Sequence, residues 1–286
     1  MGAADVVPGV SGGTMALILG IYRELIDAIK SFNLEWFKAL AKFDIKRAVA
    51  LPHFEFLMPL MIGIFSAIIF FTRIISIPKL LDSSPELVYG LFFGLIIGSI
   101  VILLQQISRW NFSFGIALCA GIIFGYLVVT LVPAETPTDW WFITLSGAVA
   151  ICAMVLPGIS GSFILLILGK YAYILDGVGH FKMQIIAPFA LGAGFGLMMF
   201  TRFLSWLLHR YEQLTMNFII GILIASLWVI WPFQDRTFEI VREKKRLLSS
   251  TPILPENLLG AWQPLLLAVI GCVFVVVISK IAVRRR

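Results

Sequence analysis

The sequence predicts an all-α integral membrane protein built as an inverted-topology repeat, in which each half has one re-entrant broken-helix hairpin and three transmembrane helices. The 286 residues are 60% hydrophobic and 13% charged, whereas soluble domains are about 45–50% apolar and about 25% charged. The apolar runs are continuous, which argues against the alternating strands of a β-barrel. A Pro-Gly-x-Ser-Gly motif occurs twice and indicates a backbone break in each half.

The first half, residues 1–135, is expected to hold one re-entrant hairpin, one interfacial helix and three spans. The hairpin covers residues 1–22, the interfacial helix about 34–50, and the spans about 54–76, 86–107 and 113–132. Each span is long enough to cross a hydrocarbon core of roughly 30 Å. Only seven residues precede Pro8, so the inbound arm of this hairpin is expected to be short.

The second half, residues 136–286, is expected to repeat the hairpin and the three spans. The hairpin covers residues 140–172, and the spans cover about 185–207, 214–232 and 260–282. The arms on either side of each break are short. A segment that enters and leaves on one face therefore fits better than a full span.

The segment predicted as an interfacial helix has two contrasting faces. Aromatic and leucine side chains fall near one helical face and lysines spaced four apart lie on another: Trp36, Phe37, Leu40 and Phe43 against Lys38, Lys42 and Lys46. Such a pattern is typical of a helix that lies in the membrane interface. A solvated connecting helix is the alternative.

The basic residues set the expected orientation. Twelve lysines and arginines fall on the side of loop 31–51 and eight on the other side, where five of the eight sit in loop 233–259 beside four acids. Short cytoplasmic loops carry an excess of lysine and arginine. Loop 31–51 and the C-terminus are therefore predicted to be cytoplasmic. The net charge of +6 is then explained by topology and anionic lipid, and no nucleic-acid partner is expected.

The two halves are similar in sequence. Between residues 8–22 and 157–171, nine of fifteen positions are identical. Residues 59–76 match 188–205 at a proline, a glycine, a phenylalanine, a Thr-Arg pair and a serine. A hairpin makes no net crossing and three spans follow it, so the second half is predicted to be inverted relative to the first. That is the plan of many secondary transporters.

Each break gives a helix a new N-terminus inside the membrane. Pro8 with Gly9 and Pro157 with Gly158 interrupt the helix, because proline lacks a donor and glycine permits tight turns. A helix that restarts has unpaired N–H groups and a partial positive charge, which bind phosphate. The candidate phosphate-binding residues are Ser11, Gly12, Gly13 and Thr14 in the first half and Ser160, Gly161 and Ser162 in the second. Alternatively, the prolines only kink a span.

Two arginines lie within predicted spans. Arg73 and Arg202 each end a long uncharged run and each follows a threonine, Thr72 and Thr201, and these four are further candidate phosphate-binding residues. An arginine in a span costs roughly 2.5–3.5 kcal/mol even by low estimates, so it is a functional hypothesis by default. A guanidinium fork suits a phosphate, and we expect one arginine at each mouth of a central anion site. The alternative is that both snorkel to the interface.

Asp5 precedes the first break, and Met154 occupies the equivalent position before the second. This carboxylate can carry a coupling proton or a sodium ion, or it can cap the helix or pair with an arginine, and the cap or pair is favoured. His53, His180 and His209 lie at span ends or in loops and are interpreted as interfacial residues. The three cysteines have no metal-binding spacing. No metal and no cofactor are expected.

The stretches GAADVVPGVSGGTMALILGIYRELI and LPGISGSFILLILGKY, with the paired Thr-Arg helices, resemble the polyprenyl-phosphate translocase family (PopT), a bacterial and archaeal membrane family formerly known only as a domain of unknown function. The resemblance covers nearly the whole chain. It implies a transporter, not an enzyme, which moves undecaprenyl phosphate from the outer to the cytoplasmic leaflet of the bacterial cytoplasmic membrane, for recycling in cell-wall synthesis. The matching positions are residues 5–13 and 157–162, Arg73 and Arg202.

Two rival functions use the same features. A membrane phosphatase acting on undecaprenyl pyrophosphate would need a nucleophile with a proton-transfer partner. Ser11 and Ser160 are candidate nucleophiles, but neither motif has a histidine or a glutamate beside it. A small-anion transporter would use the same anion site without the lateral opening that a polyprenyl tail requires.

Overall fold

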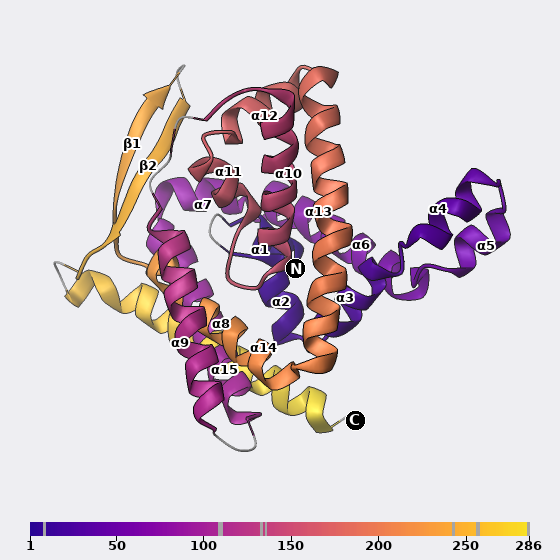
Figure 1. Ribbon diagram of the computed structural model, residues 1–286. Coiled ribbons are helices and arrows are strands. Elements are labelled where there is room, and N and C mark those ends of the chain that lie inside the picture. The colour runs from indigo at the N-terminus through magenta and orange to yellow at the C-terminus, as the bar shows by residue number, and fades with distance from the viewer. Residues whose placement is uncertain are drawn as a thin grey trace.

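The computed structural model describes residues 1–7, 10–107, 111–131, 134, 136–241, 244–255 and 258–284. This part of the chain is mostly helical (Figure 1). Six of its helices are long and apolar enough to cross a membrane: α6 (Phe54–Ile69) continued by the π-helical turn η1 (Phe70–Ile74), α8 (Pro85–Gln105), α9 (Phe112–Val129), α13 (Met183–Arg210), α14 (Glu212–Ile230) and α15 (Leu258–Arg284). The six predicted spans are therefore confirmed as helices. A short helix, α7 (Ile77–Ser83), joins η1 to α8.

Each sequence break lies within a set of three short or medium-length helices, after the first helix of the set. The first set is α1 (Gly2–Asp5), α2 (Gly12–Ile18) and α3 (Tyr22–Lys30), and the second is α10 (Trp140–Val155), α11 (Gly161–Ile167) and α12 (Tyr171–Gly179). The chain bends by 113° between α11 and α12. With seven residues each, α2 and α11 are about 10 Å long, which is too short to cross a membrane.

The turns after α2 and α11 have the same geometry. Gly20 and Gly169 both have positive φ, 71° and 61°. The next residue of each turn donates its N–H to the carbonyl five positions earlier, Ile21 to Ala16 (3.0 Å) and Lys170 to Leu165 (2.8 Å). This is a glycine-terminated helix end, and the sequence repeat extends to it.

The interfacial segment differs from the single helix predicted over about 34–50. It forms α4 (Leu34–Ala41) and α5 (Ile45–Ala50), and this pair projects from the rest of the molecule (Figure 1). Phe43 adopts a left-handed conformation, with φ of 56°. The Asp44 side chain accepts a hydrogen bond from the Arg47 N–H at 3.1 Å and so starts a new helix. A cap in mid-segment is the physical reason for the division.

The all-α prediction is wrong for one segment. Residues of loop 233–259 form the antiparallel strands β1 (Gln234–Val241) and β2 (Lys244–Pro252). The loop carries an alternating Thr-Phe-Glu-Ile pattern, which is a strand signal.

Close backbone approach at glycines joins the long helices in pairs. Extensive contacts join α8 to α15, α9 to α14 and α10 to α13. A methyl group at Gly94 would overlap the Ala268 carbonyl, and one at Gly192 would overlap the Thr144 carbonyl. Small residues at such crossings are the usual basis of helix association in membranes.

The first broken helix lies within the main core. Ala16 and Leu17 of α2 belong to one cluster of buried side chains with residues of α8 and of α14, including Ile96 and Leu223. The helix α11 belongs to a second cluster, with Ile222 of α14 among its members. Helix α14 therefore contributes to both cores.

Candidate functional site

The two breaks meet. The Gly158 N–H donates to Thr14 Oγ1 at 2.9 Å in a buried position. The Tyr22 hydroxyl donates to the Val155 carbonyl at 3.1 Å, and Ser11 Oγ to the Met154 carbonyl at 3.4 Å. The start of α2 thus lies against the end of α10 and the second break, although the two motifs are 149 residues apart in sequence.

In this conformation the first-turn donors of α2 are occupied by the protein itself. The Gly12 N–H donates to Asp5 Oδ1 at 2.9 Å, and the Gly13 N–H donates to Ser11 Oγ at 3.1 Å. The Thr14 N–H donates to the Ser11 carbonyl at 3.0 Å. A methyl group at Gly12 would lie 2.7 Å from both carboxylate oxygens of Asp5. The Asp5 carboxylate therefore caps α2 where an anion would bind.

The start of α11 is different. Ser160 occupies the N-cap position, but its side chain accepts no capping hydrogen bond. Its hydroxyl is instead paired with that of Ser162 at 2.8 Å. Gly161 is buried and Ser162 is exposed. Because Met154 stands where the first half has Asp5, this helix start carries no built-in carboxylate.

The break residues themselves are only partly described. Pro8 and Gly9 lie outside the described residues. Pro157 and Gly158 are both buried. Gly158 has φ of 90°, and a methyl group there would lie 3.1 Å from a methyl carbon of Ile222. Only glycine adopts this conformation readily. The conformation directs the Gly158 N–H toward the Thr14 hydroxyl.

The two Thr-Arg pairs have matching local geometry but different exposure. Thr72 and Thr201 each donate to the carbonyl four residues earlier, at 2.6 Å in both cases. Arg73 is exposed on η1, whereas Arg202 is half-buried and donates to the Met198 carbonyl at 3.0 Å. Within the described part of the chain, neither guanidinium forms a hydrogen bond or an ion pair with the breaks or a carboxylate. Both retain donors for a ligand.

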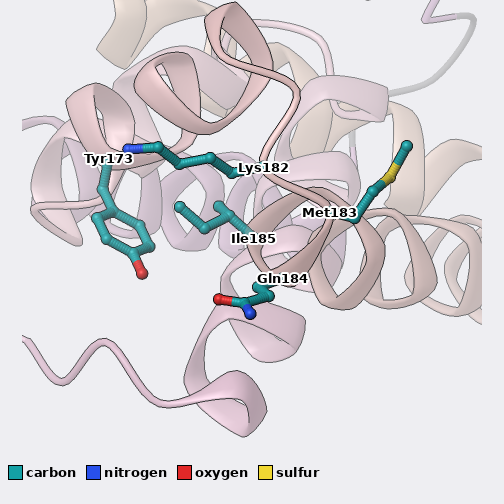
Figure 2. A pocket seen from close by; sticks show the side chains of 5 residues that line it. All are labelled: Tyr173, Lys182, Met183, Gln184 and Ile185. Carbon is teal, nitrogen blue, oxygen red and sulfur yellow. The ribbon is translucent and has the colours of Figure 1, made fainter.

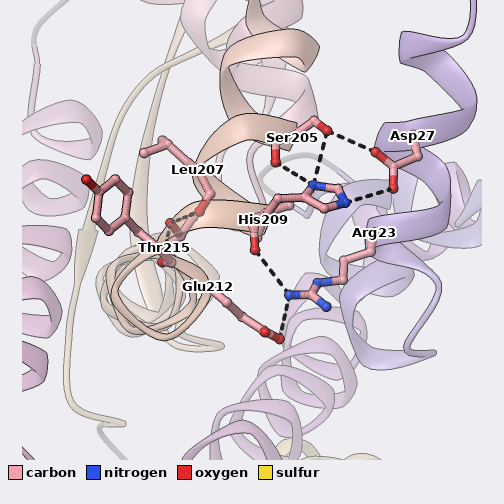
Figure 3. A network of polar contacts seen from close by, with 9 residues as sticks. Arg23, Asp27, Ser205, Leu207, His209, Glu212 and Thr215 are labelled. Carbon is pink, nitrogen blue, oxygen red and sulfur yellow. Dashed lines mark hydrogen bonds and ion pairs between the residues drawn. The ribbon is translucent and has the colours of Figure 1, made fainter.

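A polar network between α3 and α13 was not predicted from the sequence (Figure 3). Ser205 Oγ donates to Asp27 Oδ1 at 2.9 Å, and Lys30 Nζ donates to Ser205 Oγ at 3.0 Å. His209 Nε2 lies 4.0 Å from Asp27 Oδ2. Ser205 is fully buried, whereas its partners Asp27, Lys30 and His209 are partly or largely exposed. His209, interpreted from the sequence as an interfacial residue, belongs to this network.

Arg23 extends the network to α14. Its Nη2 atom lies 3.2 Å from the Leu208 carbonyl and 2.6 Å from Glu212 Oε1. The ionic side chains are 50 and 56% exposed, so this pair contributes only about 0–1 kcal/mol. The sequence signal was present, since Arg23, Asp27 and Lys30 are spaced four and three apart and therefore share one face of α3.

A surface pocket lies at the α12–α13 connection (Figure 2). Its lining residues are Tyr173, Lys182, Met183, Gln184 and Ile185. Lys182 Nζ is ion-paired with Asp176 Oδ2 at 2.7 Å. A second pocket lies between α8, Phe233 and α15. None of the sequence-predicted site residues lines either pocket.

Comparison with known proteins agrees with the resemblance noted in the sequence. Residues 1–248 match the family described as undecaprenyl phosphate translocase-like. The chain is similar to a polyprenyl-phosphate transporter of Vibrio cholerae, with 42% identity over 238 residues, which cover 82% of this chain and 76% of that protein. It is also similar to a polyprenyl-phosphate transporter of Staphylococcus aureus, with 29% identity over 251 residues, 81% of this chain and 83% of that protein. No solved structure matches the chain.

Proposed function

Because the chain belongs to the undecaprenyl phosphate translocase-like family, we propose that it transports undecaprenyl phosphate from the outer to the cytoplasmic leaflet of the bacterial cytoplasmic membrane, without hydrolysing it. The observation that carries this proposal is the contact between the two breaks through Thr14 and Gly158. Both broken segments can then bind the same anionic head group, while the polyprenyl tail stays in lipid.

The first-contact site for the phosphate is the start of α11. Ser160, Gly161 and Ser162 supply hydroxyl and backbone donors, and no carboxylate caps this helix end. Arg202 and Arg73 supply charge from α13 and η1, with their planar forks matched to phosphate oxygens. The hydroxyl pair of Ser160 and Ser162 opens when the phosphate takes its place.

The start of α2 accepts the phosphate only after Asp5 leaves. Ser11, Gly12, Gly13 and Thr14 form the second position of the head group, and the Asp5 carboxylate holds it while the phosphate is absent. Two anions cannot share the Gly12 N–H, because like charges at such short range repel each other. Asp5 therefore couples the movement of the head group to its own displacement, and a proton or sodium ion that neutralises it would favour the step.

The inverted-repeat arrangement is part of the proposal. The repeat makes α8 equivalent to α14 and α9 equivalent to α15. The observed pairs α8–α15 and α9–α14 are then equivalent to each other and join the two halves, as expected for a structure with internal two-fold symmetry.

Alternating access is suggested by residues that are equivalent in the repeat but form different bonds in the two halves. Asp27 and Ser205 are equivalent in the repeat to Asp176 and Ser76. Asp27 is bonded to Ser205 across the halves, whereas Asp176 is bonded to Lys182 and His180 of its own half. The backbone also differs at the two serines. Ser76 follows η1 in a left-handed conformation with φ of 54°, whereas Ser205 lies within the regular helix α13. We assign the Asp27–Ser205 contact to a state closed on the side of loop 31–51, and an Asp176–Ser76 contact to the opposite state.

Transport is tested by reconstitution into liposomes. The purified protein should exchange a fluorescent polyprenyl phosphate between leaflets and release no inorganic phosphate from undecaprenyl pyrophosphate. Release that Ser160→Ala abolishes would instead support a phosphatase.

Cysteine pairs test the alternating contacts. After Cys119, Cys152 and Cys272 are replaced by serine, Asp27→Cys with Ser205→Cys should crosslink and stop exchange reversibly. Asp176→Cys with Ser76→Cys should crosslink mainly when substrate is present. If the second pair never crosslinks under turnover, the alternating scheme is wrong even where transport persists.

A further inference from the structure

The hairpin of α4 and α5 is a small unit that stands apart from the helical bundle (Figure 1). Its two helices are joined by a hydrogen bond from Trp36 Nε1 to the Ala48 carbonyl at 3.0 Å, and Ala39 and Ala48 are buried between them. Phe32 makes edge-to-face contacts with Trp36 and Phe54 and so attaches the hairpin to the ends of α3 and α6. The hairpin is therefore ordered by its own contacts and leaves its outer surfaces free.

One flank of the hairpin exposes large apolar side chains. Phe43 at the tip is 88% exposed, and Ile45 and Val49 of α5 are 73 and 60% exposed. Phe37 and Leu40 of α4 are also exposed. Ile45 and Val49 are four apart and Phe37 and Leu40 are three apart, so each pair lies on one face of its helix. A contiguous apolar surface of this kind indicates an interaction site.

The Glu35–Arg47 ion pair marks a polar flank of the hairpin, and the exposed charge that remains is positive. Arg47 of α5 lies 3.8 Å from Glu35 of α4 in an ion pair across the hairpin. The Asp44 carboxylate caps α5. Both acids of the hairpin are thus engaged. Three exposed lysines, Lys38, Lys42 and Lys46, have no carboxylate partner within the described residues.

The position of the hairpin places it at the height of lipid head groups. Helix α6, which is long and apolar enough to span a membrane, begins at Phe54, four residues after α5 ends. None of the residues of α6 is fully buried within the protein, so the part of its surface that α1 and α3 do not cover is free to face lipid. In the second half only residues 180–182 separate α12 from α13. The hairpin is thus an addition to the repeated core.

We propose that the α4–α5 hairpin is a docking surface for the anionic lipid of the leaflet in which α6 begins. Phe43, Ile45 and Val49 enter the boundary between head groups and acyl chains. The long stems of Lys38, Lys42 and Lys46 let their ammonium groups reach the lipid phosphates, and the Glu35–Arg47 pair faces water. The positive charge of the three lysines selects anionic lipid, whereas two copies of the hairpin brought together would place lysines of the same charge near one another.

Fluorescence quenching in nanodiscs tests this docking. In a background with Cys119, Cys152 and Cys272 replaced by serine, an environment-sensitive dye is placed at Ile45→Cys on the apolar flank. A matched control carries the dye at Glu35→Cys on the polar flank. The bilayers contain phosphatidylcholine alone or with phosphatidylglycerol, and either brominated acyl chains or aqueous iodide serves as the quencher.

We expect bromolipid to quench the Ile45 dye and iodide to quench the Glu35 dye, with stronger bromolipid quenching when phosphatidylglycerol is present. Each lysine near an anionic surface shifts the docked-to-free ratio on the order of fivefold. Lys38→Gln, Lys42→Gln and Lys46→Gln together should therefore remove the dependence on phosphatidylglycerol.

Two outcomes would overturn the proposal. Equal iodide access at both positions in both bilayers would mean that the hairpin stands in water. Protection of the Ile45 dye that appears in detergent and rises with protein concentration would mean that a second copy covers the flank. Neither readout involves transport, so the result is independent of the proposed function.

Discussion

Asp5→Asn tests whether the carboxylate that caps α2 competes with the substrate phosphate. The Gly12 N–H donates to Asp5 at 2.9 Å. The amide of asparagine keeps an acceptor in this place but removes the charge. A hydrogen bond to a charged group is worth about 1.5–3 kcal/mol and a neutral one about 0.5–1.5 kcal/mol, so the cap weakens by about 1–1.5 kcal/mol.

A weaker cap should raise the affinity for the phosphate ligand, because the ligand must displace the cap in order to bind. If phosphate must displace the cap, a weakening of about 1–1.5 kcal/mol raises the affinity about five- to twelvefold, because each 1.4 kcal/mol is a factor of ten. The assay is equilibrium binding of a short-chain polyprenyl phosphate to purified protein in detergent. Thermal unfolding of the unliganded protein is the control, and its midpoint should fall slightly as the cap weakens.

The repeat supplies a matched variant. Met154 occupies the position equivalent to Asp5 and is 48% exposed, so an aspartate fits there. Met154→Asp should cap α11 and lower the affinity by a similar factor. The competition argument is wrong if Asp5→Asn weakens binding, or if both variants bind as the original chain does.

Three further predictions concern packing and charge. Thr14→Val should lower the unfolding free energy by about 1–3 kcal/mol, because the buried Gly158 N–H loses its acceptor, while Thr14→Ser should retain most of the stability; equal melting of the two variants would contradict this. Gly192→Ala should destabilise the protein because its methyl group overlaps the Thr144 carbonyl, whereas Gly194→Ala on the same helix meets open space and should be neutral in the same melting assay. Arg202→Lys should slow leaflet exchange and Arg202→Ala should abolish it, because lysine keeps the charge without the fork; wild-type exchange in both would mean that the side chain only snorkels.

The long helices could be predicted because length and hydropathy alone determine which segments can cross a membrane. The two breaks could be located from proline and glycine. A shared central site for the two breaks could be expected from the inverted repeat, but the bond between Thr14 and Gly158 could not, because it depends on how α2 packs among α8, α10 and α14. A cap is likewise among the favoured roles of Asp5, but its bond to the Gly12 N–H depends on the position of α1.

Local signals explain the two differences in secondary structure. The sequence around Asp44 contains a helix start, aspartate followed by a short helical stretch, and this start divides the amphipathic segment into two helices. The hairpin of β1 and β2 lies between two spans, where the alternation of polar and apolar residues indicates strands. The α3–α13 network shows a different limit. The spacing of Arg23, Asp27 and Lys30 indicates a shared face, but only the packing identifies Ser205 as their partner.

The pairing of α8 with α15 affects the order in which the chain can assemble during synthesis. Domains generally fold from the N-terminus as the ribosome delivers them. The face of α8 that includes Gly94 is completed by Ala268 of α15, which is synthesised long after α8. Until α15 arrives, this face of α8 lacks its packing partner inside the bilayer. Loss of α15 would therefore leave α8 without its neighbour and would expose the protein to membrane quality-control proteases.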